Sequence, residues 1–89
     1  GGGGYIRITR VQVDRHTLLM HVINSVGDTL DLASARAILS NLVQSQAVDK
    51  AVGQTLLWAV SDNSLRSVPK DRRDDLRASI FKQVLIHLV

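Results

Sequence analysis

The sequence contains no cysteine, and its 89 residues include a single proline. Without cysteine the chain can form neither a disulfide framework nor a thiolate metal site. This composition is typical of a reducing compartment, so we expect the protein to be cytoplasmic or otherwise intracellular. No apolar run approaches the roughly 20 residues that cross a bilayer, and no cleavable signal pattern is visible, so we expect no membrane association.

Aromatic residues are almost as rare, because Tyr5, Trp58 and Phe81 are the only ones. Apolar residues nevertheless make up 45% of the chain, so the core must be built mainly from aliphatic side chains. A chain this short forms one domain and buries only about 60 to 65% of its unfolded surface. Part of the apolar surplus is therefore expected to stay at the surface.

Glutamate is also absent, so all eight acidic residues are aspartate, whereas eight of the eleven basic residues are arginine. The formal net charge is +3, and the basic residues concentrate towards both ends of the chain. Because glutamate is a good helix former, helices in this protein must depend more on packing than on intrinsic propensity.

The start of the chain differs in composition from the rest. Residues 1–4 are all glycine, and we interpret them as a flexible linker or a cloning remnant, since glycine loses the most entropy on ordering. In residues 5–13 apolar and polar side chains alternate, with a slip at Arg10, which predicts an extended, β-like arm. A lone strand must dock on its own bundle or pair with another chain. The candidate interface residues of this arm are Ile6, Ile8, Val11 and Val13.

Apolar residues at helical spacing predict two helices in the first half of the remaining chain. The first is expected at residues 15–26, with Asp14 as its N-cap and Gly27 as a left-handed residue after its end. The second is expected to begin at residue 29 or 32 and to end at residue 44. Its alternative N-caps are Asp28 and Asp31.

Two more helices are predicted in the second half. One covers residues 47–60 and contains Gly53, which costs about 1 kcal/mol relative to alanine unless another helix approaches closely there. Turn-forming residues at 61–68 then interrupt the pattern, and the last helix is expected at residues 69–88. Its expected buried stripe includes Leu76, Ile80 and Leu85, opposite Arg73, Arg77 and Lys82.

These elements predict an all-α fold, with a four-helix orthogonal or bundle-like domain at residues 14–89 and the extended arm before it. No catalytic motif is present, so we expect a protein that is not an enzyme and that binds no cofactor. His16 and His21 are five residues apart, which does not bring them to one helix face, so we expect no metal site. An enzyme or carrier fragment remains a third alternative.

Basic residues cluster around the last predicted helix, and arginine suits phosphate recognition through its planar, bidentate donors. Asp71, Asp74 and Asp75 interleave this cluster, which favours a solvated face or an acidic protein partner over nucleic acid. A small basic nucleic-acid-binding domain is therefore the alternative function. The candidate basic patch consists of Arg66, Lys70, Arg72, Arg73, Arg77 and Lys82.

Apolar residues extend beyond a single face on several of the predicted helices, which is typical of helices that are buried all round or lie at an interface. Trp58 is the preferred anchor, because tryptophan is enriched at interface hot spots, although it equally fits the role of the largest core residue. Met20 is a further candidate interface residue. We therefore predict a non-enzymatic protein–protein interaction or oligomerisation module, excised from a larger protein, whose partner is another protein or a second copy of itself.

Overall fold

The computed structural model describes residues 13–89, and these residues form four helices and no strand. In chain order the helices are α1 (Arg15–Ser25), α2 (Leu32–Gln44), α3 (Lys50–Ala59) and α4 (Lys70–Leu88). The predicted all-α class is therefore confirmed. The predicted arm at residues 5–13 lies outside the described residues except for Val13, and the division into residues 1–4, 5–13 and 14–89 stays a prediction.

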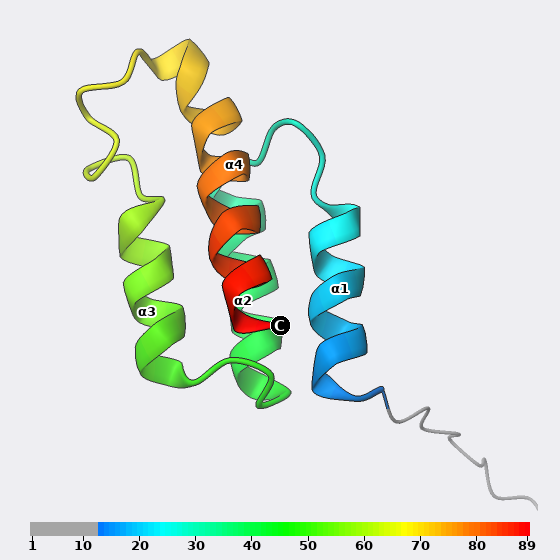
Figure 1. Ribbon diagram of the computed structural model, residues 1–89. Helices are drawn as coiled ribbons and strands as arrows, with labels where there is room; N and C mark the ends of the chain where they lie inside the picture. The colour runs from blue at the N-terminus through cyan, green and yellow to red at the C-terminus, as the bar shows by residue number, and fades with distance from the viewer. Residues whose placement is uncertain (1–12) are drawn as a thin grey trace, which may run out of the picture.

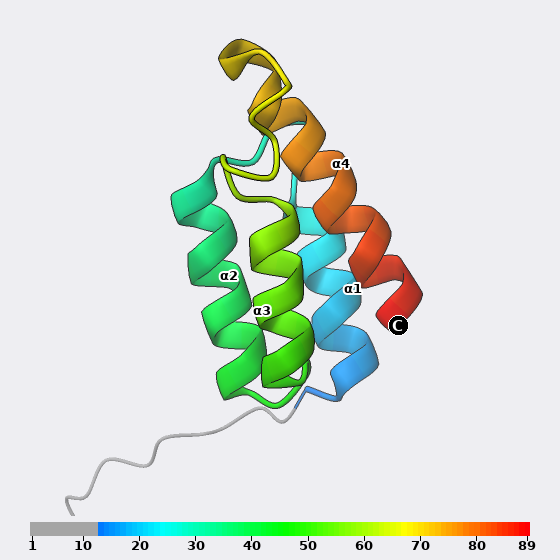
Figure 2. The same cartoon turned by 90° about the vertical axis from the view of Figure 1, so that its left-hand side faces the viewer.

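The helices pack as a bundle in which α1 contacts α4 and α2 contacts both α3 and α4. Figures 1 and 2 show α2 and α4 on one diagonal of the bundle and α1 and α3 on the other. One aliphatic core joins all four helices, and Phe81 is the aromatic residue within it. None of the helices in residues 13–89 is long and apolar enough to cross a membrane. Fully buried members of the core include Leu19, Ala35, Val60, Phe81 and Leu85.

Aspartates begin the first two helices, as predicted. The Asp14 carboxylate accepts the backbone N–H of Thr17 at 2.7 Å, and this hydrogen bond lowers the pKa of Asp14 below its ordinary value. Asp31, rather than Asp28, begins α2 and accepts both the hydroxyl and the backbone N–H of Ser34, which lower its pKa in the same way. These bonds satisfy donors that a helix N-terminus otherwise leaves unpaired.

The predicted left-handed residue at Gly27 is wrong. The chain leaves α1 in an extended conformation at Val26, and Gly27 does not adopt the left-handed conformation. Among the described non-glycine residues the left-handed position belongs instead to Gln46, with φ 63°. There the N–H of Ala47 bonds to the carbonyl of Leu42, five residues back, which is a Schellman end to α2. This reversal delays α3 to residue 50, three residues later than predicted.

The interruption at residues 61–68 is confirmed and has an identifiable hydrogen-bond basis. The hydroxyls of Ser61 and Ser64 both donate to the backbone carbonyl of Trp58, at 2.7 and 2.6 Å. Leu65 anchors the same segment because its side chain is buried. The segment is therefore an ordered connection between α3 and α4.

The predicted register of α4 is partly wrong. Leu85 is fully buried, but Ile80 is only half-buried and Leu76 is 37% exposed. The helix turns Arg77 inward instead, where 1% of its surface remains exposed. The buried stripe of α4 therefore runs through Arg77, Phe81 and Leu85, at the four-residue spacing that keeps side chains on one helix face.

Gly53 lies where a side chain of α2 closely approaches the backbone of α3, the situation in which a glycine inside a helix is expected. A Cβ atom at Gly53 would lie 2.7 Å from Cγ2 of Val43. Valine in a helix has one strongly preferred rotamer, so Val43 cannot easily turn away.

We therefore expect Gly53→Ala to destabilise the domain by about 1 to 2 kcal/mol, because overpacking outweighs the ~1 kcal/mol gain in helix propensity. Urea denaturation followed by circular dichroism measures this change. The double variant Val43→Ala/Gly53→Ala serves as the control, because it removes the clashing methyl group and should lose less than the two single changes added together. A Gly53→Ala variant more stable than the parent would contradict the close approach.

Candidate interaction surface

Arg77 extends from α4 into the interior and joins three parts of the chain. Its Nε donates to the carbonyl of Val60 at 2.7 Å, and its Nη1 donates to the carbonyl of Leu30 at 3.0 Å. The guanidinium also forms ion pairs with Asp62 and Asp74, whose side chains are 61% and 51% exposed. The side chain thus bonds to the α1–α2 loop, to the end of α3 and to its own helix. Arg77 belongs to the core and not to the predicted basic surface.

The other predicted patch residues lie at the surface but are largely engaged within the fold. Arg73 donates to the carbonyls of Val68 and Arg66, at 2.9 and 3.3 Å. Lys82 donates to the carbonyl of Gly27 at 2.8 Å, which ties α4 to the end of α1. Two further residues, Arg66 and Arg72, contact the carbonyl of Asn63 and the carboxylate of Asp75, respectively.

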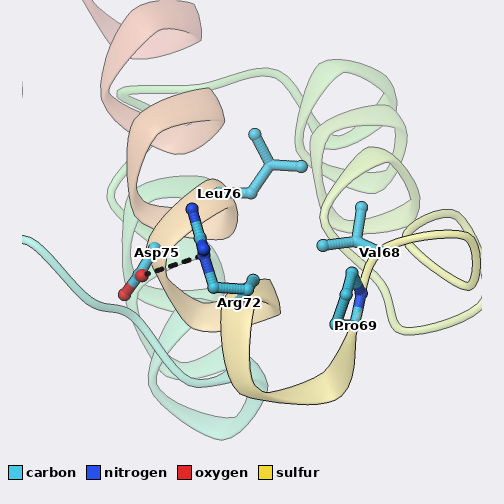
Figure 3. A pocket seen from close by; sticks show the side chains of 5 residues that line it. All are labelled: Val68, Pro69, Arg72, Asp75 and Leu76. Atoms are coloured by element: carbon cyan, nitrogen blue, oxygen red, sulfur yellow. Dashed lines mark ion pairs between the residues drawn. The ribbon is translucent and has the colours of Figure 1, made fainter.

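Among the patch residues, Lys70 alone has no hydrogen bond or ion pair in the described part of the chain. Arg72 and Asp75 form an exposed pair with 4.0 Å between their nitrogen and oxygen atoms, beside a shallow hollow of about 450 Å³. Figure 3 shows that Leu76, Val68 and Pro69 line the apolar side of this hollow. The sequence-predicted patch is therefore not one continuous basic surface.

Trp58 lies on the outside of α3 with 64% of its surface exposed, so the alternative of a core tryptophan is wrong. The other predicted interface residues do not gather around it as one group. Met20 on α1 is half-buried against the core, and Val13 is 49% exposed before α1 begins. Ile6, Ile8 and Val11 lie outside the described residues.

An apolar groove of about 300 Å³ lies between α4 and α3, the helix that carries Trp58. This groove was not predicted from the sequence. The signal that was present is the four-residue spacing of Ala51, Thr55 and Ala59, which places small side chains along one face of α3. The groove is lined by Ala51, Val52, Thr55, Leu56, Ala59 and Val84.

A second groove, of about 530 Å³, lies between α1 and α2. It combines apolar residues such as Leu18 and Ile38 with the polar side chains of His21, Asn41 and Gln44. No group of three or more histidine or acidic side chains within residues 13–89 is arranged to hold a metal ion. The described surface therefore offers apolar grooves suited to protein contact rather than a cluster suited to metal chemistry.

The described residues form a small helical bundle with an exposed tryptophan and an uncharged groove, which are features typical of helical protein-binding modules. Residues 14–86 match the family model described as the CtsR C-terminal dimerization domain. Because this match covers most of the chain, the protein belongs to that family. The expected oligomerisation module is thereby confirmed as a dimerization domain, and the partner that the family description implies is a second copy.

Individual relatives agree with the family match. The chain is 34% identical to the transcriptional regulator CtsR of Lactiplantibacillus plantarum and 28% identical to that of Bacillus subtilis, each over 89 residues. Both alignments cover 99% of this chain and 57% of the relative, so the chain spans little more than half of these proteins. A crystal structure of CtsR in complex with a 26 bp DNA duplex shares the fold, with a TM-score of 0.78 and 22% identity, over 99% of this chain and 58% of that one.

We expect Arg77→Leu to destabilise the domain by about 3 kcal/mol, because it leaves the buried carbonyls of Leu30 and Val60 without a donor. Asp62 and Asp74 contribute little to this loss, since both carboxylates can be solvated when the guanidinium is removed. The measurement is the free energy of unfolding in urea. Arg72→Leu is the matched control and should change stability by less than about 0.5 kcal/mol, because its side chain is exposed. Equal losses in the two variants would contradict a special role for Arg77.

Proposed function

We propose that this chain is the part of a CtsR-type transcriptional regulator that joins two copies, so that the complete protein binds duplex DNA as a dimer. The observation that carries the proposal is the match of residues 14–86 to a dimerization domain, on a bundle that exposes Trp58 on α3, a helix that borders an apolar groove. Tryptophan in such a setting is typical of interface hot spots. Residues 1–4 and 5–13 then form the linker and arm that precede the helical domain.

The relatives support the DNA-binding half of the proposal. They are transcriptional regulators, and the matched crystal structure contains CtsR with DNA. A dimer presents two copies of whatever reads the DNA, and two-fold related half-sites are the usual target of such regulators. A regulator of transcription works where the chromosome is, which supports a cytoplasmic location in a bacterium.

The alternative function, direct nucleic-acid binding by the helical domain, has less support from the geometry. To contact DNA phosphates, a cationic side chain must be free of hydrogen bonds within its own chain or able to break them. Arg77 is buried, and Arg73 and Lys82 donate to backbone carbonyls of their own chain. We therefore assign the helices to self-association and propose that the affinity for DNA comes mainly from elsewhere in the regulator.

The 89-residue chain is expected to sediment as a dimer at micromolar concentrations, with twice the 9.8 kDa mass of one chain. Its melting temperature should rise with protein concentration, because association stabilises the folded state by mass action. Analytical ultracentrifugation over a range of concentrations measures the dissociation constant. A monomer at every concentration up to the millimolar range would refute the proposed function.

The same chain should bind duplex DNA weakly and without preference for one sequence. Each phosphate contact adds about 0.9 to the slope of log K against log salt, so a residue that makes no such contact leaves the slope unchanged. We expect Arg72→Gln and Lys70→Gln each to change the slope by less than the ~0.9 of one phosphate contact, and to change the affinity for DNA by correspondingly little. Fluorescence anisotropy with labelled duplexes at two salt concentrations is the measurement. Tight, sequence-selective binding that these variants abolish would favour the alternative function.

A further inference from the structure

We infer that the second copy binds on the face formed by α3 and α4, with Trp58 of each copy entering the α3–α4 groove of the other. This inference rests on the proposed self-association and names the surface that performs it. The face comprises the groove between the two helices, the exposed indole and the apolar edge of α4 that continues from the groove.

The groove has the composition of an interface centre. No charged side chain lines it, and charged residues are depleted at the centres of protein interfaces. Thr55 is the one residue with a polar side-chain atom, and its hydroxyl donates to the carbonyl of Ala51 at 2.9 Å. Because this hydrogen bond lies within α3, an apolar partner can cover Thr55 without leaving a polar atom unpaired.

Trp58 has the properties of a preformed anchor. Its carbonyl accepts the hydroxyls of Ser61 and Ser64, and the carbonyl of Val60, two residues on, accepts Arg77. The backbone that holds the indole is thus fixed from two sides, which reduces the ordering cost of binding. With 64% of its surface exposed, the indole gains from burial against an apolar partner.

The apolar surface continues along α4 beyond the groove. Val84 lines the groove, Ile80 is half-buried one turn earlier, and Leu76 is 37% exposed a further turn back. These residues share one side of α4, since they are four apart. The same line reaches the apolar wall beside Pro69 in Figure 3, so the contact face extends over much of the length of α4.

The groove between α1 and α2 is the competing surface, and it is the larger of the two. It is lined by His21 and Asn41, whose side chains would each need a partner when a second copy covered them, and by Gln44, which donates to the hydroxyl of Ser40 at 3.4 Å. No exposed large apolar residue of the described chain lines it, whereas Trp58 projects from the helix that borders the α3–α4 groove. The balance of polar and apolar groups therefore favours the α3–α4 face.

A two-fold axis makes the proposed contact reciprocal, because each patch then meets its own copy. If the α3 helices of the two copies cross antiparallel near Thr55, Trp58 of one copy lies opposite Val52 of the other, and the reverse. Thr55 is then the position nearest the axis, where a substitution in one copy faces the same substitution in its partner.

The test uses the 89-residue chain with Thr55→Arg, which brings two like charges together at the axis. Like-charge contact and loss of the apolar groove should weaken dimerization by about 100-fold or more. Thr55→Ala is the matched control and should leave the dissociation constant nearly unchanged, because only a hydroxyl bonded within its own helix is lost. Asn41→Arg places the same charge in the α1–α2 groove and should also leave the dimer intact.

Trp58 provides an independent readout, because it is the only tryptophan in the chain. Dilution of the parent below its dissociation constant should move the emission to longer wavelength as the indole becomes hydrated. Thr55→Arg should emit at the long-wavelength position at every concentration, with an unchanged helical circular dichroism spectrum.

The outcomes separate this inference from the proposed function. A dimer that persists in Thr55→Arg with the same emission change, or a dimer that Asn41→Arg dissociates, overturns the assignment of the α3–α4 face while self-association stands. Emission that does not respond to dissociation of the parent removes Trp58 from the contact and overturns the assignment as well. A parent chain that never dimerises refutes the proposed function itself.

Discussion

The buried guanidinium of Arg77 is the contact on which the arrangement of the helices most depends. It bonds to carbonyls that no helical hydrogen bond serves, at Leu30 between α1 and α2 and at Val60 after α3. The N–H of Leu30 returns a bond to the carbonyl of Asp74, so the α1–α2 loop is held to α4 in both directions. Both partner aspartates remain half-exposed, which lowers the desolvation cost that makes fully buried ion pairs expensive.

Features that depend on neighbouring residues could be predicted from the sequence, whereas features that depend on contacts between distant residues could not. The caps at Asp14 and Asp31 follow from side chains that bond within three residues. Arg77 could not be placed inside, because its carbonyl acceptors lie 17 and 47 residues away and hydropathy favours Leu76 for the neighbouring position. The left-handed residue was misassigned for a related reason, since glycine permits that conformation without requiring it, and the packing of α2 against α3 imposes it on Gln46.

The candidate interaction surface was likewise predictable only in part. Trp58 could be named from the sequence because a lone tryptophan has few roles in an aliphatic protein, but its exposure depends on the phase of α3, which the sequence left open. The four-residue spacing of the small residues opposite Val84 did not predict a groove, because alanine and threonine fit a solvated helix face equally well. The basic residues are clustered along the chain but not on one surface of the fold. Arg77 is buried in the core, and Arg73 and Lys82 donate hydrogen bonds to backbone carbonyls.

The hydrogen bonds of Arg77 that hold the core together also affect the exposed surface at Trp58. Trp58 lies in the last turn of α3 and Val60 is the residue directly after the helix, so the hydrogen bond from Arg77 to the carbonyl of Val60 also limits the movement of Trp58. A domain of this size has little stability of its own and cannot cover all of its apolar surface. The surface that stays uncovered in one copy is then a source of association free energy, provided that it is rigid before binding. The buried Arg77 therefore supports association by keeping the end of α3, and with it the exposed Trp58, rigid before the second copy binds.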